Sequence, residues 1–202
     1  MKTTPIFIIL IILFSCNAQE KKQLKKSTQK YTEMTTEKFD IEKFEKNKIN
    51  NECNFILEDG TTVRQTGDEN NYIEYIMPPK PNLIEIYRQF YKSGKLQRHI
   101  LSFPNDFLIL KKEYDENGNL TEEINYDTPY KFTFEQLLEL IKKEKDTIDL
   151  YDKNTSIGRS TDTTGTFWYI TYKKISMRRE RIKIDGITGE ILERSHYPHE
   201  DN

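Results

Sequence analysis

Histidine and cysteine are the residues of this chain best suited to catalysis or transition-metal binding, and it has only three histidines and two cysteines. Nucleophilic catalysis needs a Ser, Cys or Lys beside a base. His99 has no partner motif, and His196 and His199 lie close to the C-terminus with Glu200 and Asp201, where chain ends commonly fray. Carboxylates are numerous, but nothing singles out a pair. We therefore expect no enzyme, no metal site and no cofactor.

The net charge of the chain gives no reason to expect that it binds nucleic acid. Lys and Arg number 31 against 33 Asp and Glu, a formal net charge of -2, and such near neutrality does not attract a polyanion. Basic residues do cluster locally, which is compatible either with solvated faces or with a phosphate or lipid headgroup site. The clusters are Lys21, Lys22, Lys25 and Lys26, and Lys173, Lys174, Arg178, Arg179 and Arg181.

The first sixteen residues have the proportions of a secretion signal, with Lys2, an apolar stretch over 6–14, and then Ser15 and Cys16. Nine residues rise about 14 Å as a helix, too little for a hydrocarbon core of about 30 Å. The stretch therefore does not predict a transmembrane anchor.

Leu13, Phe14, Ser15 and Cys16 resemble the lipobox of bacterial lipoproteins, which is an aliphatic residue, two usually small residues and a cysteine. The resemblance implies cleavage before Cys16, diacylglycerol on its thiol and an acyl chain such as palmitate on the new amino terminus. Two or three acyl chains anchor a protein firmly, whereas one is marginal. The expected location is the cell envelope, facing the periplasm or the cell surface. The alternative is an ordinary cleaved signal with Cys16 incidental.

If Cys16 carries lipid, Cys53 is the only other thiol, so no disulfide can form within the chain. We expect Cys53 to be a small buried apolar residue, with an intermolecular bridge as the alternative.

The rest of the chain predicts an α+β fold in consecutive segments. After the signal at 1–15 we expect a lipidated tether and a short helix capped by Thr36 over 16–50, then β-hairpins over 51–128. A helix packed on an antiparallel sheet follows over 129–197, and 198–202 forms a tail. The tether is rich in Lys and Gln and is interpreted as disordered.

The hairpin region shows a period of two with glycine turns at Gly60, Gly94 and Gly118. When the last two glycines are superposed, Phe90 aligns with Tyr114 and Leu96 with Leu120, which indicates an internal repeat. The pattern resembles the MORN-type repeats of bacterial antitoxin-like proteins. The resemblance implies an immunity or antitoxin-like role against a toxin in the periplasm.

The strongest helix signal begins at Thr133, where Gln136 completes a capping box. Its apolar positions fall on one face at i, i+3, i+4 and i+7, so that face must pack on another element. These positions are Phe134, Leu137, Leu138 and Ile141.

An aromatic strand over 167–172 and a hairpin around the turn at 185–190 follow, with 152–164 expected to be a loop. Asp185, Thr188, Gly189, Glu190 and Ile191, with Trp168 in the preceding strand, resemble the signature of the PepSY domain family, a helix followed by antiparallel strands. PepSY domains are implicated in restraining peptidases. The alternative is that the turn residues serve hairpin geometry alone.

The function expected from these features is that of an envelope lipoprotein acting as a noncatalytic binding or inhibitory protein. Its partners would be the membrane, through Cys16, and a protein such as a peptidase. An immunity protein or a structural envelope lipoprotein are the alternatives. The expected contact surface consists of Phe167, Trp168, Tyr169, Tyr172, Asp185, Thr188 and Glu190.

Overall fold

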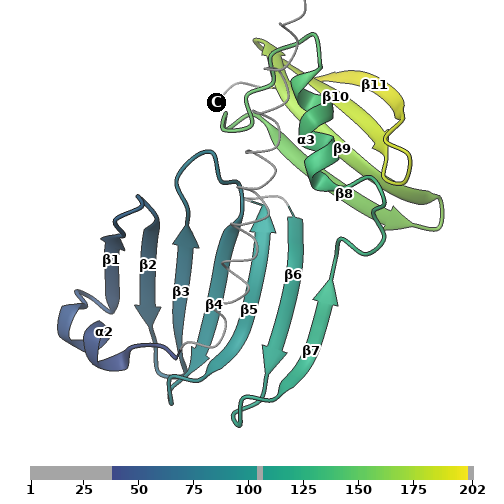
Figure 1. The fold of residues 1–202 in the computed structure, drawn as a ribbon. Coiled ribbons are helices and arrows are strands. Elements are labelled where there is room, and N and C mark those ends of the chain that lie inside the picture. Colours follow the sequence, from purple (N-terminus) through teal and green to yellow (C-terminus); the bar gives the residue numbers. More distant parts are fainter. Residues whose placement is uncertain (1–37, 104–106, 200–202) are drawn as a thin grey trace, which may run out of the picture.

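The computed structural model describes residues 38–103 and 107–199 (Figure 1). The signal, the lipobox with Cys16, the tether and the predicted helix cap Thr36 lie outside the described residues, as do Glu200 and Asp201.

The described chain is mainly β-structure, with two antiparallel sheets and two short helices, α2 (Ile41–Asn47) and α3 (Phe134–Lys142). The first sheet joins seven strands in chain order, and the second has the order β11-β10-β9-β8. The first contains β1 (Glu52–Ile56), β2 (Thr62–Gly67), β3 (Asn71–Met77), β4 (Glu85–Tyr91), β5 (Leu96–Phe103), β6 (Phe107–Tyr114) and β7 (Leu120–Asn125). The second contains β8 (Ser156–Asp162), β9 (Gly165–Ile175), β10 (Arg178–Asp185) and β11 (Ile191–Pro198).

The hairpin-rich middle is confirmed, because every strand of the first sheet pairs antiparallel with its neighbour in sequence. The three turn glycines Gly60, Gly94 and Gly118 all have positive φ, between 80° and 90°. Each glycine N–H donates to the carbonyl three residues before it, and that residue donates to the carbonyl just after the glycine. The expected repeat is therefore present as a repeated turn geometry.

The predicted capping box of α3 is confirmed. The Thr133 side chain accepts a hydrogen bond from the N–H of Gln136, and the Gln136 side chain accepts from the Thr133 N–H. Leu137 and Ile141 are buried on the side of the helix that faces the second sheet, where they pack against Trp168 and its neighbours.

The expected short helix is present as α2, but the prediction of Thr36 as its cap is wrong, because the Asp40 side chain accepts the Lys43 N–H and caps the helix. Phe44 of α2 packs against the first sheet.

The αββ arrangement expected for the C-terminal part is wrong in one respect, because the predicted loop over 152–164 contains the strand β8. This strand pairs with β9 along its whole length, from Ser156 opposite Thr171 to Asp162 opposite Gly165. Only Ile157 of β8 is both apolar and buried. As an edge strand it depends on backbone hydrogen bonds, which leave no hydrophobic pattern in the sequence.

One core joins the two sheets. Phe103 and Phe107 of the first sheet pack against Phe134 of α3, and the Phe107 ring lies 5.4 Å from the Trp168 ring, edge to face. The Arg159 guanidinium lies over Phe107 at 4.6 Å and also hydrogen bonds to the carbonyl of Leu108. These contacts hold the end of the first sheet against the second.

Candidate functional site

The predicted contact surface does not form one exposed patch. Trp168 is only 1% exposed and its indole N–H donates to the Phe132 carbonyl at 2.9 Å, so it is a core residue. Phe167 and Tyr172 are also buried, and the Tyr172 hydroxyl donates to Asp146 at 2.7 Å. These three side chains cannot meet a partner while this fold is intact.

Tyr169 lies on the face of β9 opposite to Trp168 and Tyr172, half-buried, where Arg181 stacks on its ring at 4.4 Å. In the turn, the Asp185 carboxylate accepts the backbone N–H groups of Ile187 and Thr188, each at 2.8 Å. These two hydrogen bonds hold the pKa of Asp185 below its usual value.

The backbone N–H of Glu190, the last residue of that turn, also donates to a side chain of the turn. Thr188 Oγ1 accepts the Glu190 N–H at 3.2 Å. The Asp185 carboxylate and the Thr188 hydroxyl are thus engaged within the turn itself, which agrees with the structural interpretation of its sequence.

Other candidate chemistry is sparse among the described residues. No group of three or more His, Cys, Asp or Glu side chains there could hold a metal ion, and none of the described helices is long and apolar enough to cross a membrane. Cys53 is a free thiol, half-buried against the aromatic cluster around Phe44.

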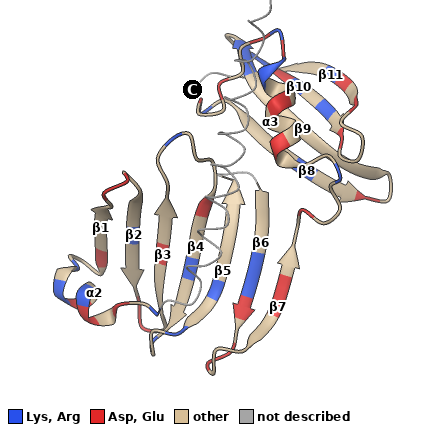
Figure 2. Cartoon of the chain, in the orientation of Figure 1, with Lys and Arg blue, Asp and Glu red and all other residues tan. Residues whose placement is uncertain are grey.

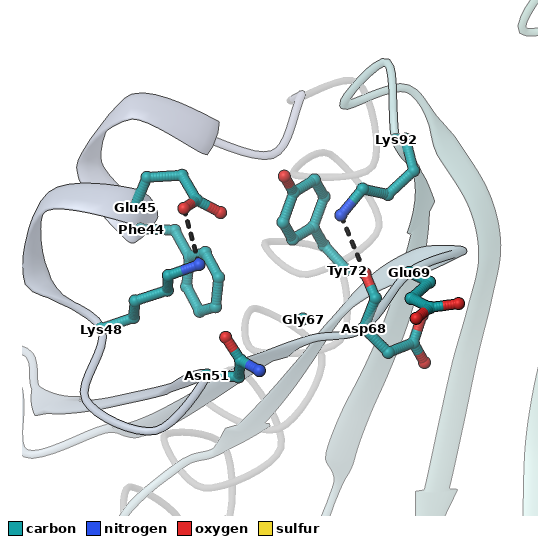
Figure 3. Close-up of a pocket in the computed structure, with 9 residues that line it drawn as sticks. All are labelled: Phe44, Glu45, Lys48, Asn51, Gly67, Asp68, Glu69, Tyr72 and Lys92. Carbon is teal, nitrogen blue, oxygen red and sulfur yellow. Dashed lines mark hydrogen bonds and ion pairs between the residues drawn. The ribbon is translucent and has the colours of Figure 1, made fainter.

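A shallow pocket lies between α2 and the β2–β3 turn (Figure 3). Its two lysines are already engaged, because Lys48 pairs with Glu45 at 2.6 Å and Lys92 donates to the Asp68 carbonyl at 2.9 Å. The Asp68 carboxylate accepts two backbone N–H groups of the same turn. Both cations of the pocket are therefore already engaged, and the other charged group on its β2–β3 turn, Glu69, lies exposed. The pocket thus presents no vacant cation that would select an anionic ligand.

The most unusual arrangement is a row of polar side chains that crosses the first sheet. Each strand from β2 to β7 places one polar residue directly opposite the next, on the same face. Figure 2 colours the charged residues on both faces of these strands; Gln65 and His99, which are not charged residues in its key, are tan there. We call this set the polar row; it consists of Gln65, Glu74, Arg88, His99, Lys112 and Glu123.

Neighbours in the polar row bind one another. Gln65 donates to Glu74 Oε1 at 2.9 Å, and Arg88 Nη1 lies 3.3 Å from Glu74 Oε2. At the other end Lys112 lies 3.4 Å from Glu123. Arg88 is only 4% exposed, so its charge relies on Glu74 in a region with little water.

His99 is the one member without such a partner. Its ring is fully buried, and neither ring nitrogen has a hydrogen-bond partner among the described residues. Burial, with a smaller contribution from the charges of Arg88 and Lys112, lowers the pKa of His99 to about 4. The imidazole is therefore neutral at neutral pH.

The polar row lies beside an apolar row on the same face. Val63, Ile76, Ile86 and Leu101 stand opposite one another and are 1% to 4% exposed. All apolar side chains packed in this cluster come from the first sheet or from the segment leading into β4. Strands alone cannot bury one face of their own sheet to this degree, and within 38–103 and 107–199 no second layer of apolar side chains covers its centre. We call the two rows together the inner face.

Sequence reasoning missed the polar row, although a signal was present. In β4 the inward positions are Ile86, Arg88 and Phe90, so a charged residue interrupts an apolar alternation. Glu74 stands in the same way between Tyr72 and Ile76. The opposite face differs, because ion pairs exposed to solvent such as Arg98 with Glu113 cover it.

Comparison of the chain with protein-family models, with curated proteins and with solved structures finds no match. The fold and the inner face are therefore interpreted from their own geometry.

Proposed function

We propose that this chain is a bacterial envelope lipoprotein, cleaved before Cys16 and anchored by lipid on that residue, whose body binds a protein partner without catalysis. The lipobox residues 13–16 support the anchor. Between Cys16 and the first described residue lie 21 residues, which span at most roughly 75 Å when extended. Such a tether gives the body reach from a membrane surface.

The inner face supports the binding role. It combines a buried apolar row with a polar row in which three nitrogens, Arg88 Nε and both ring nitrogens of His99, find no hydrogen-bond partner within 38–103 and 107–199. Because most side chains of the two rows are already buried, a partner can reach them only by displacing what now covers them. Unsatisfied buried polar groups are costly, so this exchange favours a ligand that supplies acceptors and apolar surface together. A polypeptide segment lying across the strands has this chemistry.

The partner class follows from the two resemblances. A PepSY-like end implies a peptidase that is held in check, and MORN-type repeats imply a toxin that is neutralised. The repeated glycine turns of the first sheet support the second candidate, a toxin. A structural role without a discrete partner is the third.

The test is mass spectrometry of the protein purified from its native membranes after crosslinking. We expect the N-terminal peptide to begin at acylated Cys16 and a peptidase or toxin to copurify in stoichiometric amount. An unmodified Cys16 would overturn the anchor. An acylated protein without a specific partner would overturn the binding role and leave the structural one.

A further inference from the structure

The turn between β9 and β10 presents apolar side chains to solvent. Ile175 is 56% exposed and Met177 is 62% exposed, and all residues from Lys173 to Met177 are exposed. Large apolar residues at a two-residue turn add nothing to the core of the second sheet. We call this segment the hairpin tip; it consists of Lys173, Lys174, Ile175, Ser176, Met177 and Arg178.

Met177 has a backbone conformation that is unfavourable for methionine. Its φ is 57°, in the left-handed region where glycine and asparagine are preferred because other side chains crowd the backbone. Methionine at such a position is an unfavourable choice for the turn itself. We therefore infer that the Met177 side chain has a role other than stabilising the turn.

Cations surround the apolar pair. Lys174 and Arg178 have side chains 48% and 40% exposed, and each is paired on one side, with Asp146 and Glu180 respectively. Lys173 adds a third exposed cation beside them. Aliphatic side chains ringed by Lys and Arg match the boundary between acyl chains and anionic headgroups.

The tip also lies far from the inner face. Trp168 is the residue of β9 whose ring contacts Phe107 of the first sheet. Ile175 is seven residues further along the strand, roughly 23 Å at the usual rise. In Figure 1 this end of the second sheet points away from the seven strands.

We propose that the hairpin tip is a second membrane contact, which inserts Ile175 and Met177 at the surface of an anionic lipid bilayer while Lys173, Lys174 and Arg178 meet the headgroups. The inference rests on the proposed lipid anchor, which raises the local concentration of membrane so that a weak contact suffices. It places the first sheet away from the bilayer, where a partner can reach it.

The test uses a chain from residue 17 onward, with an N-terminal histidine tag that binds nickel-chelating lipids in place of Cys16. In a Cys53→Ala background, an environment-sensitive fluorophore is attached at Met177→Cys or at the control Ile56→Cys. Ile56 is 72% exposed and also adjoins a turn, but acidic residues follow it. Vesicles contain either phosphatidylcholine alone or a third of phosphatidylglycerol.

We expect the label at residue 177 to shift its emission to the blue and brighten at least twofold on the anionic vesicles, while the label at residue 56 does not change. Unchanged emission at 177 with the protein fully bound would overturn the inference, as would equal changes at both sites. Because the tag supplies the anchor, this result is independent of whether Cys16 is acylated in cells.

An unlabelled variant gives a second readout. Met177→Asn suits the left-handed backbone, so its melting temperature should equal or exceed that of the parent chain. Binding of the untagged chain to anionic vesicles should nevertheless fall at least threefold, and Ile56→Asn should leave it unchanged. Full vesicle binding by Met177→Asn would overturn the inference.

Discussion

Arg88 Nη1 lies 3.3 Å from Glu74 Oε2 at the centre of the first sheet, with the two side chains only 4% and 13% exposed. A buried ion pair of this kind offsets part of the cost of removing two charges from water, and it fails if one charge is left alone. A substitution that removes one charge of this pair should therefore destabilise the first sheet, whereas removing both charges should destabilise it much less.

The first prediction follows from that pair. Arg88→Met should lower the free energy of unfolding by about 3 kcal/mol, because Glu74 then remains charged in a region with little water. The double variant Glu74→Gln with Arg88→Met should lose much less than the sum of the two single variants. Urea unfolding of all four proteins measures the coupling. Additive losses would show that the two residues do not stabilise each other.

The second prediction concerns pH. The pKa of His99 is about 4 in the folded protein, below its ordinary value of 6.5, so between these values the unfolded chain binds a proton that the folded chain excludes. Stability should therefore fall as the pH decreases from about 6.5 to about 4, by roughly 3 kcal/mol from this residue.

Urea unfolding at several pH values measures this effect. His99→Leu should retain its stability at pH 7 and lose much less of it between pH 7 and pH 5 than the parent chain. His196→Gln, on exposed β11, should behave as the parent chain does. An unchanged pH dependence in His99→Leu would contradict the assignment.

The third prediction separates core from surface on β9. Trp168→Ala should cost about 3 to 5 kcal/mol, because it empties a buried site and leaves the Phe132 carbonyl without its donor. Tyr169→Ala should cost roughly 1 kcal/mol, since its ring is half-buried and stacks on Arg181. Thermal unfolding compares the two, and equal losses would contradict the placement of Trp168 in the core.

The fourth prediction concerns two turn glycines with similar backbones. Gly189 has φ 78° and an added Cβ would approach Phe132 Cε2 to 2.4 Å, whereas Gly118 has φ 90° and nothing within 4 Å. Gly118→Ala should cost about 1 kcal/mol for the backbone alone. Gly189→Ala should cost at least about 2 kcal/mol, since overpacking adds to that term. Similar melting temperatures for the two variants would contradict the close packing of the turn on Phe132.

Local patterns in the sequence predict most of the secondary structure correctly. The capping box at Thr133 and Gln136 and the glycine turns are decided by neighbouring residues, so they can be read without the fold. The strand β8 could not be found, because its order comes from pairing with β9 rather than from its own residues.

The functional surface was harder to predict for a related reason. Trp168 and Tyr172 look like interaction residues by type, but the long-range packing of α3 and the first sheet places them in the core. Conversely, Arg88 and His99 are adjacent only through strand register, which a single sequence does not reveal. The composition of each strand suggested a polar position without indicating that six of them align.

Site-specific photocrosslinking in the native cell envelope tests the central claim most directly. A photoreactive residue replaces Leu110, whose side chain lies on the inner face opposite Leu101, or Lys111, its neighbour on the other face. The account predicts a discrete crosslink to another protein from position 110 and none from position 111. A crosslink from position 111 alone, or none from position 110, would contradict the inner face as the binding surface.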